Sequence, residues 1–149
     1  MKAMRQSNLP DEWAALANAA RAARARAYAP YSRFTVGAAL RDRQGHIHTG
    51  CNIENASYGL TVCAERVAIW GAVAGGEGVF CALAVASETG AMPCGACRQV
   101  LAEFAPEMPV VIVDAQGNAW MTSVDELLPG SFTPAQLATD DQDTAPGGL

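Results

Sequence analysis

Residues 79–86 read VFCALAVA, the longest unbroken apolar run of the chain. A run that is apolar on both faces is typical of a strand in the middle of a sheet, covered on both sides. Helical spacing of apolar residues precedes it over residues 62–74 and follows it over residues 95–104, and a second buried strand is predicted at residues 110–113. Strands separated by helices indicate parallel crossover connections.

The remaining segments extend this β-α-β centre. A helix is predicted between Pro10 and Pro30, and a hairpin from residues 34–40 and 46–51. A short strand at residues 119–122 and a single helical turn at 125–128 complete the order. We therefore expect an α/β fold, a single three-layer α-β-α domain over residues 1–137 with a mixed five-stranded sheet. Residues 138–149 are polar and acidic and are expected to form a flexible tail.

Composition excludes several classes of protein. The 149 residues are 50% hydrophobic and 17% charged, which excludes a disordered chain. The net charge of −5 disfavours nucleic acid as a partner. Residues 79–86 are far too few to cross a bilayer, which takes roughly 20 apolar residues, and the N-terminus has no secretory pattern. We expect a cytoplasmic protein without a membrane partner, whose five cysteines stay reduced.

Three cysteines stand at predicted helix starts, where free backbone N–H groups stabilise thiolates. Cys94 and Cys97 form a Cys-x-x-Cys pair, which alone is ambiguous between a metal site and a redox dithiol, with two core cysteines as a less favoured alternative. With Cys63 as a third thiolate, a tetrahedral zinc would keep one open position, as catalytic zinc does. The other candidate ligands are expected to be structural or solvated: Cys51, Cys81, His46 and His48.

Glu65 lies two positions after Cys63. A carboxylate there could complement the helix dipole, or it could move protons beside a water activated by zinc. Three thiolates around Zn²⁺ leave a net charge of −1. Arg66 and Arg98 each follow a cysteine directly, and we expect them to donate hydrogen bonds to the sulfurs.

The motifs CAER at residues 63–66 and PCGACRQ at 93–99 resemble the zinc signature of the nucleoside and base deaminases. Three further segments resemble the small homotetrameric cytidine deaminases: YSRFTVGAAL at 31–40, NIENASY at 52–58 and LLPGSF at 127–132. The resemblance extends from about Trp13 to Phe132. It implies zinc-dependent hydrolytic deamination of cytidine and deoxycytidine, and a role in pyrimidine salvage.

The resemblance also implies roles at the catalytic centre. Cys63, Cys94 and Cys97 would bind one Zn²⁺ per subunit, with water in the fourth position. Glu65 would carry a proton from this water to N3 of the pyrimidine and then to the leaving ammonia. The backbone N–H of Ala64 would contact the base carbonyl.

A second set of implied roles concerns the nucleoside. Asn52 and Glu54 match positions that hydrogen-bond the ribose 3′-hydroxyl, and Phe34 matches an aromatic beside the nucleoside. Ala56, Tyr58 and Phe132 match positions that reach the active site of a neighbouring subunit. We therefore expect a homotetramer with shared active sites.

Gly59 and Met92 depart from the residues that many relatives carry, commonly Pro and Ser, and both flank the site.

Other functions stay open from the residues alone. A deaminase of the same scaffold acting on an antibiotic such as blasticidin S is the nearest. A polynucleotide deaminase is less favoured, because this acidic chain has no basic stripe that would bind a single strand. A zinc-stabilised binding protein and a redox dithiol protein belong to different classes.

Overall fold

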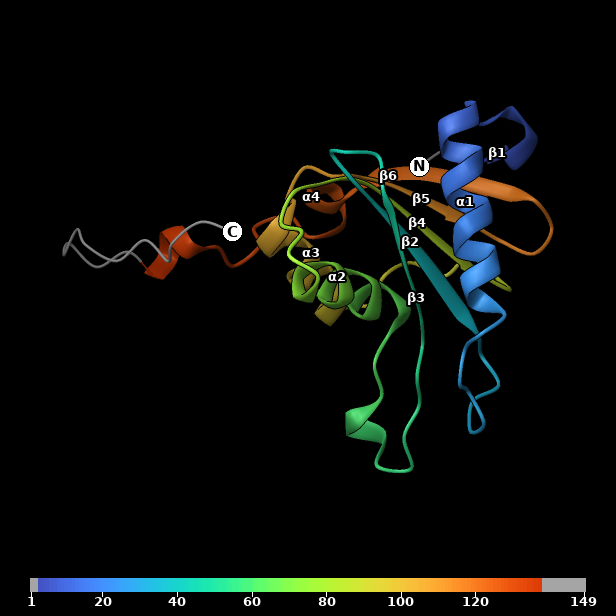
Figure 1. The fold of residues 1–149 in the computed structure, drawn as a ribbon, viewed down its shortest axis with the longest axis horizontal. Coiled ribbons are helices and arrows are strands. Elements are labelled where there is room, and N and C mark those ends of the chain that lie inside the picture. Colours follow the sequence, from blue (N-terminus) through green and yellow to red (C-terminus); the bar gives the residue numbers. More distant parts are fainter. Residues whose placement is uncertain (1–2, 138–149) are drawn as a thin grey trace.

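The computed structural model describes residues 3–137, so the tail expected at 138–149 lies outside the described residues. Helices and strands follow one another along the chain as in Figure 1. Their bounds are β1 Ala3–Arg5, α1 Asp11–Arg24, β2 Val36–Asp42, β3 Ile47–Cys51, α2 Ala64–Ala74, β4 Phe80–Ser87, α3 Gly95–Phe104, β5 Pro109–Val113, β6 Asn118–Ser123 and α4 Val124–Leu127. Three short 3₁₀ turns cover Gln6–Asn8, Tyr58–Leu60 and Pro134–Leu137. No helix of the described part is both long and apolar enough to cross a membrane.

The sheet has six strands in the order β1-β6-β5-β4-β2-β3. The pair β4–β5 is parallel, with α3 as its crossover, and the other neighbouring pairs are antiparallel. The mixed α/β class is confirmed, but the prediction of five strands is wrong. The additional strand β1 is exposed along its length and is formed by backbone pairing with β6, so it carries no apolar pattern that predicts it.

Helices cover both faces of this sheet. Helix α1 buries Leu16, Ala17 and Ala20 against the alanines of β4 and the valines of β5. Helices α2 and α3 pack on the opposite face, over Leu83 and Ile112. Figure 1 shows α1 on one side of the sheet, with α2 and α3 on the other. The two buried clusters form a three-layer α-β-α arrangement.

Two helices begin or end elsewhere than the pattern indicated. Helix α1 ends at Arg24, well before Pro30, because the backbone of Tyr28 pairs with the chain at Asn52 and Glu54. Helix α2 begins at Ala64 rather than Val62, because Val62 exchanges backbone hydrogen bonds with Ile53. These pairings join two loops, residues 25–35 and 52–63, that project from the same end of the molecule (Figure 1).

Candidate active site

The three cysteines that the sequence placed at helix starts meet in the structure. Cys63 is the N-cap of α2, Cys94 is the N-cap of α3, and Cys97 lies in the first turn of α3. The Cys63 and Cys94 sulfurs are 3.7 Å apart, and those of Cys94 and Cys97 are 3.5 Å apart. A tetrahedral zinc with Zn–S distances of about 2.3 Å holds its sulfurs about 3.8 Å apart, so the cluster fits that ion. Within residues 3–137, no fourth His, Cys, Asp or Glu joins this group.

The surroundings of the cluster favour ionisation of the Cys63 sulfur and hold a proton on that of Cys97. The pKa of Cys63 is lowered to about 5, chiefly by the hydrogen bond from the Cys97 thiol and also by Arg66. The pKa of Cys97 is raised, because its thiol donates a hydrogen bond to the Cys63 sulfur and because the residue is buried. A thiolate at a helix N-terminus is the ionised form that binds metals.

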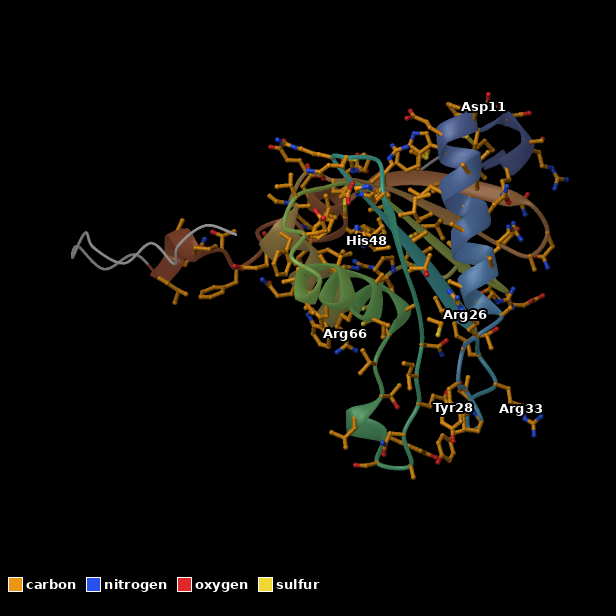
Figure 2. All side chains as sticks on the ribbon, viewed as in Figure 1. Asp11, Arg26, Tyr28, Arg33, His48 and Arg66 are labelled. Carbon is orange, nitrogen blue, oxygen red and sulfur yellow. The ribbon has the colours of Figure 1, made fainter. Side chains whose placement is uncertain are left out.

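Arg66 lies against this cluster. Its Nη2 atom is 3.5 Å from the Cys63 sulfur, and its guanidinium stacks on Trp70 at 5.6 Å from the ring centroid. Its Nε is buried and, within the described residues, has no hydrogen-bond partner. Figure 2 labels Arg66 on α2. The residue therefore brings a positive charge next to the thiolates, as expected from the sequence.

Arg98 has different partners from those expected. Its Nε donates to the carbonyl oxygen of Pro93, and its Nη1 donates to that of Leu127, both at 2.7 Å. The guanidinium thus joins the loop that precedes Cys94 to the end of α4. This contact supports the position of the cysteine loop through the backbone rather than through a sulfur.

Glu65 is the second residue of α2 and is only 4% exposed. Burial raises the pKa of its carboxyl to about 7, and the nearby Cys63 thiolate acts in the same direction. A carboxyl with a pKa near the working pH can both accept and release a proton. The backbone N–H of Ala64 belongs to the same first turn.

Asn52 and Phe34 are connected through the backbone. The Asn52 side chain is buried, accepts a hydrogen bond from the N–H of Val36 and donates one to the carbonyl oxygen of Phe34, both at 2.8 Å. Asn52 therefore fixes the segment that enters β2. The ring of Phe34 stays 39% exposed.

Glu54 connects the two projecting loops through hydrogen bonds. Its carboxylate accepts hydrogen bonds from the backbone N–H of Tyr31, at 2.8 Å, and from the hydroxyl and N–H of Ser32. The Ser32 hydrogen bond lowers the pKa of Glu54, which keeps the carboxylate ionised. A cavity of about 260 Å³ lies here, lined by Tyr31, Ser32, Glu54, Tyr58 and Thr61. The sequence motif contained Ser32 but did not indicate that it holds Glu54.

The three residues expected to reach a neighbouring subunit are on the surface. Ala56 is exposed, the Tyr58 side chain is 74% exposed and that of Phe132 is 57% exposed. The carbonyl oxygen of Phe132 accepts a hydrogen bond from Gln99 of α3 at 2.8 Å. Gln99 belongs to the cysteine motif, but only the structure connects it with Phe132.

The structure thus brings one set of predicted residues to the cysteine cluster and another set to the loop cavity. Glu65 and Arg66 accompany the cysteines, and Glu54 and Tyr58 line the cavity. Thr61 lines the cavity and is two residues before Cys63, so one short segment connects the two sets.

Known proteins resemble the chain over this region. Residues 11–115 match the family model described as the cytidine and deoxycytidylate deaminase zinc-binding region. A cytidine deaminase of Sporosarcina psychrophila is 50% identical over 119 residues, which cover 78% of this chain and 88% of the relative. The crystal structure of a cytidine deaminase from Burkholderia pseudomallei has 52% identity and a TM-score of 0.78, covering 80% of this chain and 98% of that one. A blasticidin-S deaminase of Bacillus cereus is 32% identical over 108 residues, or 66% of this chain and 76% of the relative.

Proposed function

The chain belongs to the zinc-dependent cytidine and deoxycytidylate deaminase family, and on this premise we propose how its own residues deaminate cytidine. The protein is a hydrolase, and zinc is its cofactor. The observation that carries the assignment is a buried carboxyl, Glu65, two residues after Cys63, whose sulfur meets those of Cys94 and Cys97. The products are uridine and ammonia, which is consistent with pyrimidine salvage.

Cys63, Cys94 and Cys97 would hold the metal. Zinc in this site supplies a water of near-neutral pKa as the nucleophile for C4 of the pyrimidine. Arg66 offsets the negative charge of the three thiolates, which would otherwise weaken that acidity.

Glu65 moves the protons. Its carboxylate takes a proton from the attacking water and delivers it to N3 of the base as the C4–O bond forms. Glu65 then takes the remaining proton from the new C4 hydroxyl and passes it to the amino group, so that the C4–N bond breaks, C4 becomes a carbonyl and ammonia leaves. A carboxyl with a pKa of about 7 is suited to both directions of transfer. The N–H of Ala64 would hold the base carbonyl in this orientation.

Asn52 and Glu54 would bind the ribose 3′-hydroxyl. A carboxylate oxygen has two lone pairs, so Glu54 can accept from the sugar while it keeps its hydrogen bonds to Tyr31 and Ser32. Phe34 would pack beside the nucleoside. These contacts do not involve the 2′-hydroxyl, so deoxycytidine is also a substrate under this proposal.

A homotetramer would complete the site. Tyr58 and Phe132 expose large apolar surfaces on segments at the edge of the subunit, and Ala56 is exposed beside Tyr58. Exposed aromatic side chains of this kind are typical of interfaces between subunits. Phe132 of one subunit would cover the base bound by another. Three zinc-binding thiolates need a reducing environment, which supports a cytoplasmic location.

Turnover by the zinc-replete protein tests this function. Ammonia release and the ultraviolet change from cytidine to uridine should both be seen, with similar turnover of deoxycytidine. Free cytosine should be poor, because the groups that pair with the ribose hydroxyl would be left without a partner. Turnover of blasticidin S alone would show that the substrate is the antibiotic, and an absence of zinc from active protein would contradict the mechanism.

A further inference from the structure

The two histidines of the chain meet on one buried carboxylate, away from the cysteines. Asp42 ends β2, and its side chain has no exposed surface. Its Oδ2 atom lies 3.1 Å from His46 Nδ1 and 2.9 Å from His48 Nε2, and its Oδ1 accepts the backbone N–H of His46 at 2.9 Å. Figure 2 labels His48 on β3. The tight turn at Gly45, with φ of 89°, brings the His46 ring back over Asp42.

A second carboxylate approaches the same place from another segment. A carboxylate oxygen of Glu77, an Asp42 oxygen and a His46 ring nitrogen all lie within 4.8 Å of one another. Glu77 belongs to the link between α2 and β4, where its N–H donates to the carbonyl oxygen of Ala72 at 3.0 Å. This hydrogen bond fixes the backbone of Glu77 at the C-terminal end of α2.

The charges around this cluster are unbalanced. Within residues 3–137, the ion pairs of Asp42 are with His46 and His48, and Glu77 takes part in none. No arginine or lysine of the described residues therefore lies within ion-pair distance of either carboxylate. Hydrogen bonds from His46 and His48 satisfy the buried Asp42 carboxylate, but in the part of the chain that the structure describes no fixed positive charge is paired with it or with Glu77. A divalent cation would neutralise the two carboxylates.

We propose that Asp42, His46 and Glu77 form a second binding site for a divalent metal ion, with Zn²⁺ as the ion that fits the donors best. Imidazole nitrogen together with carboxylate oxygen is a ligand set that zinc accepts, with bonds of about 2.0–2.2 Å. Such bonds in a tetrahedron hold ligand atoms about 3.3–3.5 Å apart. The Asp42 and His46 atoms are nearly at this separation, and rotation of the partly exposed Glu77 side chain brings in the third ligand.

His48 would act as a positioning residue in this site. Its Nε2–H donates to Asp42 and holds the carboxylate that binds the metal, as neighbours of metal ligands commonly do. His46 would bind the ion through the lone pair of Nδ1, which requires the ring proton to be on Nε2.

The second site is separate from the catalytic one. Cys63 precedes the first residue of α2 and Glu77 follows its last turn, so the 11-residue helix separates the two by roughly 16 Å. A site with three thiolates retains zinc far more strongly than one with imidazole and carboxylates. Mild chelation should therefore empty the second site and leave the first one loaded.

Zinc content per subunit tests the proposal without reference to activity. The holoenzyme is treated with a mild chelator to reach one zinc per subunit, then dialysed against Zn²⁺ at concentrations up to about 100 μM, and its zinc is counted. The wild type should take up a second equivalent. The variants His46→Gln and Glu77→Gln should stay near one, and His48→Gln should bind the second ion about 10-fold more weakly. Both ligand variants change partly or largely exposed side chains, so the fold should survive.

Glu103→Gln is the matched control, because Glu103 is an exposed carboxylate on α3 and should leave the second equivalent intact. A second zinc that binds equally to wild type, His46→Gln and Glu77→Gln would be adventitious and would overturn the proposal. Wild type that stays at one zinc per subunit would overturn it as well. Failure of the catalytic assignment would appear differently, as a protein without the first, tightly held zinc.

Discussion

Gly50 of β3 lies directly against the carbonyl oxygen of Ala64, the first residue of α2. A Cβ atom added at Gly50 would be 2.4 Å from that oxygen and 2.5 Å from the backbone nitrogen of Ala68. Both neighbours are backbone atoms, which cannot rotate away. The absence of a side chain at position 50 therefore lets the helix that carries Glu65 sit directly on the hairpin.

Gly50→Ala should displace the start of α2. We expect the free energy of unfolding to fall by about 1–3 kcal/mol, as for other substitutions that overfill a packed interior. The rate should also fall, because Glu65 moves with Ala64. The measurements are urea unfolding and cytidine turnover. Gly71→Ala is the control, since this exposed residue of α2 would place a Cβ that meets no atom within 4 Å. Equal stability and rate in the two variants would contradict this account of the packing.

Glu65→Gln should keep zinc and the fold but lose about 10²–10⁴-fold in kcat, because the amide cannot accept the proton from the attacking water. Metal content, circular dichroism and cytidine turnover measure the three properties. The variant should unfold no more readily than wild type, since the neutral amide avoids burying a charge. A variant with nearly full activity would remove Glu65 from the mechanism.

Arg66→Gln should weaken zinc binding at the cysteines. Arg66 donates to the Cys63 sulfur and helps to lower the pKa of that thiol, so its loss makes the thiolate less available. Loss of such a neighbour costs about 10–100-fold in metal affinity, measurable by competition with a chelator. The control is Arg26→Gln, which removes a surface arginine bonded to Thr49. Unchanged affinity in Arg66→Gln would show that the contact is passive.

Acid should destabilise the protein through Asp42. Burial alone would raise the pKa of this carboxyl, but hydrogen bonds from His48 and His46 lower it from 3.8 to about 2. Between these values the unfolded chain binds more protons, so stability is complete above about pH 4 and is lost as the pH falls toward 2. Asp42→Asn should be less stable at neutral pH and should show a flatter dependence below about pH 4.

Urea midpoints at several pH values test this dependence. The control is Asp11→Asn at the exposed start of α1, which should keep the wild-type dependence. A dependence in Asp42→Asn as steep as that of wild type would assign acid sensitivity to other carboxyls.

Phe132→Ala and Glu65→Gln should complement each other if active sites are shared. In mixed tetramers half of the sites keep Glu65, and half of these receive an intact Phe132, so roughly a quarter of wild-type activity should return. Each variant alone should have little activity. The two chains are co-expressed with different tags and the mixed species is assayed. Activity equal to the sum of the separate variants would place Phe132 in the site of its own subunit.

The sequence predicted the parts of the molecule whose pattern is local. Helix α3 begins and ends at the predicted residues, Gly95 and Phe104, because the backbone is extended at Cys94 and Pro106 follows the helix. The meeting of Cys63 with Cys94 followed from two helix starts in a parallel β-α-β arrangement. The contact of Arg98 with Leu127 could not be predicted, because the two are 29 residues apart in sequence and meet only through the arrangement of β5, β6 and α4.

The first and last strands of the described residues pair at one edge of the sheet. Ala3 pairs with Trp120 and Arg5 pairs with Asn118, so β1 has no partner until β6 is in place. A pairing between such distant residues carries a large loop-closure cost and forms late in folding. A chain that stops before Asn118 would leave the edge of β5 open, and open strand edges are where chains pair with one another and aggregate. Formation of β6 therefore both completes the sheet and protects it from aggregation.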